Sequence, residues 1–261
     1  MRTSGIEVTY IDHCGSDLSV VNAARVSFEK ESDWEYEDPE YKSSSPWVAK
    51  WLNEKDKKLI SYLARHQHTS PFNHCFASFR VKAPIFVARQ LVKHKFLPWN
   101  EVSRRYVDSE PEFFIPEYWR EKADNVKQGS SESEVKEPWK AASWAKNATE
   151  AALFAYNSML TEGVCPEQAR MVLPQNTMTE WIWSGTLGAW ADMCKLRLDA
   201  HAQKETRDVA ERISFEMNCL YPVSWPVFLS SKACVHQKYT LSCRAGGFRA
   251  PARIRPIAVP A

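Results

Sequence analysis

Seven basic side chains gather in the 28 residues from Phe79 to Tyr106, a segment with a single acid, Glu101. They are Arg80, Lys82, Arg89, Lys93, Lys95, Arg104 and Arg105. Cations at this density bind anions, and arginine in particular matches phosphate oxygens through two parallel hydrogen bonds. Basic residues near a helix end are also commonly just solvated, so the density alone leaves both interpretations open.

A strand, a helix and a loop must position these side chains. Residues 76–83 alternate polar and apolar side chains, which is typical of a strand. Pro84 is expected at the first position of a helix, and Pro98 prevents that helix from continuing. Residues 93–95 are therefore expected in or just after the last helical turn, where cations suit the negative end of the helix dipole.

The spacing of these residues is more specific than their charge. Lys93-His94-Lys95, seven further residues and Ser103 resemble the signature of the flavin-dependent thymidylate synthases, which is Arg-His-Arg, seven residues and serine. The chain is similar to that family over roughly residues 18 to 230. Other similar stretches, in the same order, are Ala24–Phe28, Ser70–Phe72, Ala83–Gln90, Asn100–Glu101, Ala169–Pro174, Leu196–Arg197 and His201–Gln203.

The resemblance implies a fold and an activity. It implies an α+β catalytic domain over residues 1–230, with a central antiparallel or mixed sheet and flanking helices. The implied reaction is reductive methylation of dUMP to dTMP, with methylenetetrahydrofolate as carbon donor and NADPH-reduced FAD as hydride source. Members of the family are homotetramers with shared active sites, so the resemblance implies the same here.

The resemblance also implies which residues bind the nucleotide. For dUMP they are Gln90, Lys93, Glu101, Ser103, Arg104, Arg105, Arg170 and Arg197. Arg105 and Arg170 are the expected phosphate ligands because a guanidinium matches phosphate oxygens. Arg197 is the expected catalytic residue, since a cation against the uracil ring would favour electron density at N3 and O4 and make C5 nucleophilic. Each arginine alone would be interpreted as a surface ion pair.

A second implied set binds FAD. Its members are His68, Ser70, Lys93, His94, Lys95, Glu101 and Asp192. Reduced flavin carries negative charge around N1 and the C2 carbonyl, which the cations of residues 93–95 are expected to stabilise. Lysine stands on both sides of His94 where the family has arginine, which keeps the charge but loses the planar fork.

Two further departures affect the flavin site. Asn73 stands where many relatives carry glutamate, and residues 184–192 lack the asparagine contacts that many relatives have. The adenosine end of the cofactor is therefore expected to be held differently.

Composition sets outer limits. The net charge of +2 and 25% charged residues favour neither nucleic acid nor membrane as a partner. No run of about 18 apolar residues and no secretory segment occur, so a cytoplasmic location is expected. Seven cysteines form no Cys-x-x-Cys pair, and Cys234, His236 and Cys243 lack a fourth ligand, so no metal site is expected. Three cysteines beside the similar stretches are expected to pack rather than react: Cys75, Cys165 and Cys194.

Periodicity predicts the remaining elements. A first strand is expected over residues 6–11, and helices over residues 18–26, 47–65, 141–160 and 204–220. Thr179 is expected to cap a helix that runs to about Leu198 and buries Trp181, Trp183, Leu187 and Trp190. Charged, serine-rich stretches predict exposed insertions near residues 29–46 and 121–139, and residues 231–261 are expected to form a partly disordered extension.

Two other functions stay open. A related flavin enzyme would transfer a hydroxymethyl group to a pyrimidine nucleotide, and the mass of the product would separate the two reactions. A non-catalytic nucleic-acid-binding module would instead use the basic segment and the arginine-rich tail. Such a module would bind DNA or RNA with a steep salt dependence and would hold no chromophore.

Overall fold

A four-stranded sheet forms the centre of the computed structural model, which describes residues 1–37, 49–107, 109–123 and 130–230. The strand order is β2-β5-β10-β6, and each neighbouring pair is antiparallel. The strands are β2 (Glu7–Cys14), β5 (Phe76–Pro84), β10 (Met178–Thr186) and β6 (Trp99–Glu101). The expected α+β class with a central antiparallel sheet is thus confirmed.

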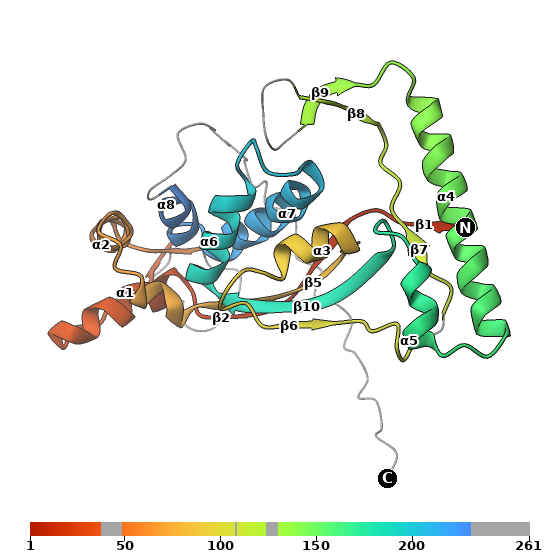
Figure 1. Ribbon diagram of the computed structural model, residues 1–261. Coiled ribbons are helices and arrows are strands. Elements are labelled where there is room, and N and C mark those ends of the chain that lie inside the picture. The colour runs from red at the N-terminus through yellow and green to blue at the C-terminus, as the bar shows by residue number, and fades with distance from the viewer. Residues whose placement is uncertain (38–48, 108, 124–129, 231–261) are drawn as a thin grey trace, which may run out of the picture.

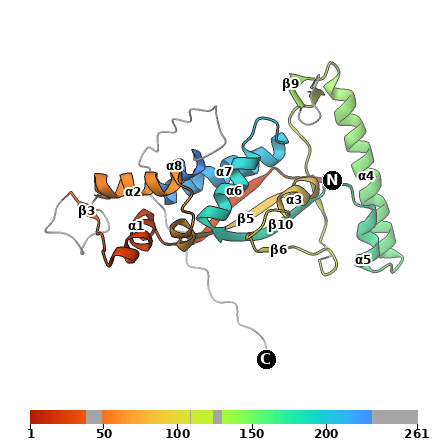
Figure 2. The same ribbon diagram turned by 60° about the vertical axis from the view of Figure 1, so that its left-hand side comes forward.

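Helices lie over one face and at both ends of this sheet (Figure 1, Figure 2). They are α1 (Asp17–Arg25), α2 (Glu54–Arg65), α3 (Ile85–Leu91), α4 (Pro138–Thr161), α5 (Pro166–Ala169), α6 (Leu187–Arg197), α7 (Lys204–Leu220) and α8 (Ser224–Ser230). Short 3-10 turns cover Val26–Phe28, Ser70–His74 and Arg170–Val172. Both ribbon views place α4 and α5 at one end of the sheet and α1 and α2 at the other, with α6 and α7 over its middle (Figure 1, Figure 2).

Three pairs of short strands complete the described chain. They are β1 (Arg2–Thr3) with β7 (Glu112–Phe113), β3 (Glu35–Tyr36) with β4 (Lys50–Trp51), and β8 (Arg120–Lys122) with β9 (Ser130–Glu134). The β8-β9 pair and the start of α4 lie within the insertion expected near residues 121–139. The other expected insertion falls partly on residues 38–48, and the expected extension and Cys234, His236 and Cys243 fall on residues 231–261; both ranges lie outside the described residues.

The helix expected from Thr179 is wrong in its first half. Residues 178–186 form β10, and α6 begins only at Leu187, where the Thr186 side chain accepts a hydrogen bond from the Ala189 backbone N–H at 3.2 Å. Trp181 and Trp183 are buried, as expected, but with the period of two that a strand has. Aromatic and β-branched residues dominate this stretch, and they favour strands when a partner strand is available.

An aromatic core fixes α6 on the sheet. Trp190 of α6 is fully buried, contacts Phe79 of β5 edge-on at 5.1 Å and Trp183 of β10 at 4.9 Å between ring centroids. Its Nε1–H donates to the carbonyl oxygen of Ala77 at 3.2 Å. Edge-to-face aromatic pairs add to the stabilisation from burial alone. The C-terminal end of α6, which carries Arg197, is therefore held rigidly above β5 and β10.

Two predicted helix starts also differ. Pro84 is the last residue of β5 and precedes the first helical residue, Ile85, instead of occupying that position. The helix expected from residue 47 begins at Glu54, because Asn53 accepts a hydrogen bond from the Asp56 backbone N–H at 2.9 Å and caps it. The helices expected over residues 18–26, 141–160 and 204–220 are confirmed as α1, α4 and α7.

Among residues 1–37, 49–107, 109–123 and 130–230, no helix is both long and apolar enough to cross a membrane. Nor do three histidine, cysteine or carboxylate side chains from these ranges gather as metal ligands.

Candidate active site

Arg197 lies at the C-terminal end of α6 and is bound to the C-terminal end of α3. Its Nε–H donates to Nε2 of His94 at 2.9 Å, and its Nη2 donates to the backbone carbonyl oxygen of Gln90 at 3.0 Å. Both acceptors are neutral, and among the described residues no acid forms an ion pair with Arg197. Burial lowers the pKa of Arg197, yet an arginine side chain stays protonated in proteins.

His94 is a neutral acceptor in this arrangement. Burial, followed by the charge of Arg197, lowers the pKa of His94 from 6.5 to about 4. A ring nitrogen that accepts from Arg197 also carries no proton of its own. The expectation that His94 contributes a cation beside Lys93 and Lys95 is therefore wrong, whereas the side chains of both lysines are exposed.

Gln90 connects this cluster to the start of α7. Its Nε2–H donates to Oε1 of Gln203, whose own Nε2–H donates to Oε2 of Glu205 at 3.0 Å. Glu205 is buried and forms an ion pair with Arg120 of β8 at 2.8 Å. Sequence reasoning missed Glu205 and Arg120 because the two residues lie 85 positions apart, and the local sequence around either one does not indicate its partner.

A second group of expected nucleotide ligands lines a pocket of about 800 Å³. Glu101, Arg104 and Arg170 all lie in its wall, and Arg89 of α3 joins them. The other ionisable side chains in the wall are Arg2, Lys82, Glu110, Glu112, Glu167 and Glu180. The Arg170 side chain donates only to the backbone carbonyl oxygen of Glu167, at 3.3 Å, among the contacts within the described chain, so its charge is not neutralised by a hydrogen-bonded acid.

Glu101 is oriented by two donors. Oε1 accepts from the Thr179 hydroxyl at 2.7 Å, and Oε2 accepts from the Trp99 indole N–H at 3.1 Å. Both donors belong to paired strands, since Glu101 of β6 lies opposite Trp181 of β10. The carboxylate is thus presented in one orientation at the pocket edge.

Ser103 and Arg105 belong to the turn that follows β6. The Arg105 Nε–H donates to the Ser103 hydroxyl oxygen at 3.1 Å, and its guanidinium lies 4.9 Å from the ring centroid of Tyr106. Arg105 and Tyr106 are both exposed. Ser103 of the same turn therefore orients the Arg105 side chain, which is exposed at the surface.

The residues expected to hold FAD are presented on the surface. His68, Ser70 and Asp192 are exposed. The loop that carries His68 and Ser70 packs against the start of α6, where the Thr186 hydroxyl donates to Oδ1 of Asn73 at 2.9 Å. Asn73 therefore uses its side-chain carbonyl oxygen in a contact within the chain.

A single chain does not bring the whole expected site together. Gln90, His94 and Arg197 form one hydrogen-bonded cluster, whereas Glu101, Arg104 and Arg170 face the 800 Å³ pocket. Helix α3 separates them, because Arg89 points into that pocket and Gln90, one position later, points to Gln203. Adjacent helical residues diverge by about 100° around the axis.

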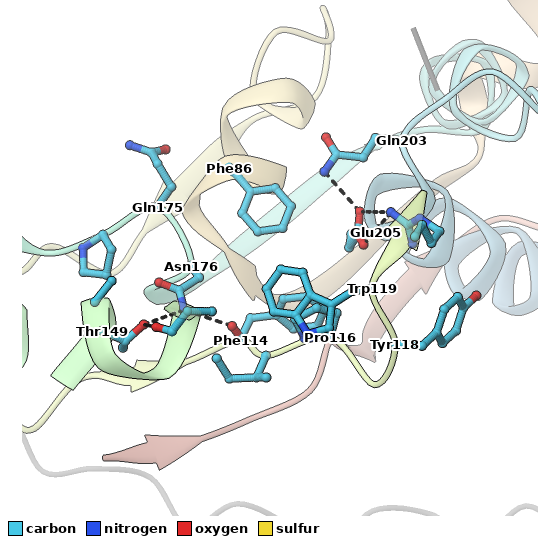
Figure 3. Close-up of a pocket in the computed structure, with 15 residues that line it drawn as sticks. Phe86, Phe114, Pro116, Tyr118, Trp119, Thr149, Gln175, Asn176, Gln203 and Glu205 are labelled. Atoms are coloured by element: carbon cyan, nitrogen blue, oxygen red, sulfur yellow. Dashed lines mark hydrogen bonds and ion pairs between the residues drawn. The ribbon is translucent and has the colours of Figure 1, made fainter. Parts of the chain in front are cut away.

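A smaller pocket of about 460 Å³ lies on the other side of α3 (Figure 3). Its wall contains Phe86, Phe114 and Trp119, and Gln203 and Glu205 close one side of it. Ile85 lines the larger pocket and Phe86 the smaller one, so α3 lies between the two, and Gln175 lines both. The wall is mainly apolar, and its charged groups are those of the Arg120–Glu205 ion pair.

Two of the three cysteines beside the site are unreactive packing residues. Cys75 and Cys194 are buried, and burial raises the pKa of both thiols, that of Cys75 to about 12. A thiol in such a setting is not a nucleophile. Cys165 is exposed, so the expectation that it packs in the interior is wrong.

Comparison with known proteins gives a consistent result. Residues 9–223 match the family model described as thymidylate synthase complementing protein. A flavin-dependent thymidylate synthase of Thermus thermophilus is 38% identical over 221 residues, which cover 85% of this chain and 74% of the relative. The flavin-dependent thymidylate synthase of Thermosipho africanus is 35% identical over 224 residues, covering 84% of this chain and 89% of the relative.

Two solved structures of one nucleotide methylase also superpose on this chain. The crystal structure of the UMP/dUMP methylase PolB from Streptomyces cacaoi, bound with 5-Br dUMP, superposes with a TM-score of 0.73 at 28% identity. The alignment covers 89% of this chain and 98% of that chain. The same methylase bound with 5-Br UMP superposes with a TM-score of 0.74 at 27% identity.

Proposed function

Because this chain belongs to the thymidylate synthase complementing protein family, whose similar members are flavin-dependent thymidylate synthases, we propose that it reductively methylates dUMP to dTMP. The observation that carries the proposal furthest is the arrangement of Arg197. Its Nε and Nη2 are held by two neutral acceptors, one of them His94 of the signature, and no acid of the described residues pairs with it, so Arg197 presents its positive charge in a fixed orientation.

Arg197 is the catalytic residue of the proposed reaction. Its remaining N–H donors would contact O4 of uracil, so that negative charge gathers on that edge of the ring as C5 reacts. Charge there raises the electron density at C5, which attacks the one-carbon unit. Burial lowers the pKa of Arg197, which makes its N–H groups stronger donors to a developing anion.

The phosphate of dUMP would be held by Arg105 and Arg170. Both guanidinium groups lack a hydrogen-bonded acid within the described chain, so each is able to offer two parallel donors to phosphate oxygens. Ser103 holds Arg105, and Arg104 and Glu101 lie at the rim of the 800 Å³ pocket. Lys93 would add a cation from the end of α3.

The residues present fit FAD. Lys93 and Lys95 offer exposed positive charge, and His68, Ser70 and Asp192 offer exposed polar groups around the first half of α6. FAD would supply the hydride that reduces the transferred methylene to methyl. His94 would act there as a neutral group rather than a cation, because its Nε2 accepts from Arg197.

In the balanced reaction, dUMP, methylenetetrahydrofolate, NADPH and a proton would give dTMP, tetrahydrofolate and NADP⁺. The folate loses its one-carbon unit, and the two electrons of the new methyl group come from NADPH through the flavin. We assign this chemistry to a catalytic domain over residues 1–230.

We place the complete site between chains of a homotetramer. The separation of the Gln90–Arg197 cluster from the Arg170 pocket supports this, because one nucleotide needs both. Exposed apolar side chains beside the signature point the same way, since Phe96 is 84% and Leu196 58% exposed. Apolar side chains this exposed favour burial against another copy.

The test is spectroscopic first and chemical second. The purified protein is titrated with FAD, then reduced anaerobically by NADPH with and without dUMP, and the nucleotide product is weighed by mass spectrometry. We expect bound flavin, a reduction rate that responds to dUMP, and dTMP as product. A hydroxymethylated product would replace the proposed reaction with the alternative transfer, and a protein that binds no FAD would overturn both.

A second substrate is favoured by one comparison. The Streptomyces cacaoi relative is named a UMP/dUMP methylase and was solved with both 5-Br dUMP and 5-Br UMP. UMP therefore belongs in the same assay as a competing substrate. The ratio of kcat/KM for dUMP and UMP decides whether this chain methylates one or both.

A further inference from the structure

The side-chain amide of Gln90 uses its hydrogens inside the protein. Its Nε2 donates to Oε1 of Gln203 and, in a longer contact of 3.4 Å, to the backbone carbonyl oxygen of Phe86. Within the part of the chain that the structure describes, no hydrogen bond reaches its Oε1. Gln90 is half-buried, so this oxygen is the group it offers to a ligand.

Gln203 determines that orientation, and Glu205 determines the orientation of Gln203. An ionised carboxylate only accepts hydrogen bonds, so Gln203 must turn its NH₂ group toward Glu205 (Figure 3). The carbonyl oxygen of Gln203 then faces Gln90, so the NH₂ group of Gln90 must donate the hydrogen bond between them. The direction of every hydrogen bond in the series follows from the one charged acceptor at its end.

Arg120 holds that acceptor in place. One guanidinium nitrogen of Arg120 lies 2.8 Å from Oε1 and 3.1 Å from Oε2 of Glu205, whose side chain is 9% exposed. A carboxylate at this depth requires a charged partner. The ion pair therefore keeps residue 205 an acceptor, and reversal of the two amides would leave it facing a carbonyl oxygen.

We propose that Glu205 and Gln203 are positioning residues that make Gln90 a pure hydrogen-bond acceptor toward the nucleotide. Gln90 then binds a donor of dUMP, either the N3–H of uracil or a sugar hydroxyl, and does not bind the phosphate, which offers acceptors. The inference rests on the proposed function, because that function places dUMP against Gln90. Arg197 supports the placement, since it donates to the backbone oxygen of the same residue.

The first experiment measures dUMP binding to the FAD-loaded protein by calorimetry. In Glu205→Gln the neutral amide accepts or donates, so Gln203 and Gln90 lose their fixed direction. We expect the dissociation constant for dUMP to rise about tenfold, the value of one hydrogen bond to a correctly oriented group. Glu211→Gln is the matched control, because Glu211 is an exposed glutamate on the same helix; its dissociation constant should not change.

Two dUMP analogues identify the donor. The N3-methyl analogue lacks the ring N–H, and the 3′-deoxy analogue lacks the hydroxyl. We expect the analogue without the Gln90 donor to bind the unchanged protein about tenfold more weakly than dUMP, and this penalty to shrink in Glu205→Gln. A penalty that is equal in both proteins for both analogues would overturn the proposal.

Rescue separates positioning from a merely structural role. Gln90→Glu alone places an acceptor against the Gln203 oxygen, so dUMP binding should weaken strongly. Adding Glu205→Gln lets Gln203 reverse, donating to position 90 and accepting from position 205. We expect the double variant to bind dUMP about tenfold more tightly than Gln90→Glu alone; equal affinities would contradict the proposal.

Misfolding of Glu205→Gln and failure of the proposed function must both be distinguished from failure of this proposal. Should Glu205→Gln not fold, Gln203→Met breaks the series while leaving the Arg120–Glu205 ion pair intact, and the same loss of dUMP affinity is expected. Unchanged binding in that variant counts against the proposal. Failure of the unchanged protein to form dTMP would instead refute the proposed function. That result comes from the activity of the unchanged protein, whereas this proposal is tested by the dUMP affinities of the variants.

Discussion

Arg197 donates its Nε–H to Nε2 of His94 across 2.9 Å, and this contact joins the last turn of α6 to the end of α3. The contact is possible only while that imidazole nitrogen carries no proton. This hydrogen bond therefore fixes the orientation of the Arg197 guanidinium and requires His94 to be neutral. It also connects the Lys-His-Lys signature to a residue about a hundred positions later in the chain.

The charge state of His94 predicts a pH dependence of stability. Its pKa in the folded protein is about 4, below the value of 6.5 for an unperturbed side chain. Between these values the unfolded chain binds a proton that the folded chain does not, so the free energy of unfolding falls as the pH falls from about 6.5 toward about 4. Thermal unfolding at several pH values measures this.

The comparison variant is His94→Gln, whose amide oxygen is able to accept from Arg197 without titrating. We expect it to lose less stability than the unchanged protein over the same acid range. His74→Gln, a change at an exposed histidine, should leave the pH profile as it is. Parallel profiles for all three proteins would show that His94 does not titrate in this way.

Arg197→Lys should nearly abolish turnover while leaving flavin bound. An ammonium group carries the charge but lacks the fork that meets His94, Gln90 and a ligand together. We expect kcat for dTMP formation to fall about a hundredfold or more, with little change in FAD affinity. Arg212→Lys, at an exposed arginine of α7, is the control. A similar loss of kcat in that variant would show that the effect is not specific to Arg197.

Replacing Lys93 and Lys95 together by arginine should strengthen FAD binding. Both side chains are exposed, and arginine restores the planar donor fork that the family signature carries. We expect a dissociation constant for FAD lower by about threefold to tenfold, measured by the change in flavin fluorescence. Lys55→Arg with Lys58→Arg, at exposed positions on α2, should change nothing.

Gly185→Ala should distort the loop that contains Lys95, Phe96 and Leu97. A Cβ at this position of β10 would lie 2.3 Å from Cδ2 of Leu97 and 3.2 Å from the carbonyl oxygen of Phe96. We expect a loss of about 1–3 kcal/mol in the free energy of unfolding and weaker FAD binding, because Lys95 belongs to the same loop. Gly5→Ala, with no atom within 4 Å of its added Cβ, is the control.

Trp190→Phe tests the aromatic support of α6. The indole is fully buried and donates to the Ala77 carbonyl oxygen, and phenylalanine would leave both a cavity and a lost hydrogen bond. We expect urea unfolding to show a loss of about 1–3 kcal/mol. Trp139→Phe, at a tryptophan that is 65% exposed, should cost less than about 0.5 kcal/mol.

Several elements could be predicted from the sequence because their causes are local. The alternation in residues 76–83 predicts β5, and the apolar spacing over residues 204–220 predicts α7, since each pattern has one period. The stretch 178–186 misled the prediction because its tryptophans suit a buried helix or a buried strand equally. Pairing with β5 on one side and β6 on the other decided for the strand.

The properties of the candidate site also divide into those that depend on sequence alone and those that depend on folding. The sequence by itself determined which charged groups the chain carries and their order along it, and with the resemblance it predicted the role of Arg197. Only the tertiary structure decided that His94 is neutral, that α3 directs Arg89 and Gln90 to different places, and that Glu205 meets Arg120. Charge is a property of each side chain, whereas burial, hydrogen-bond direction and pKa depend on neighbours that folding brings from distant parts of the chain.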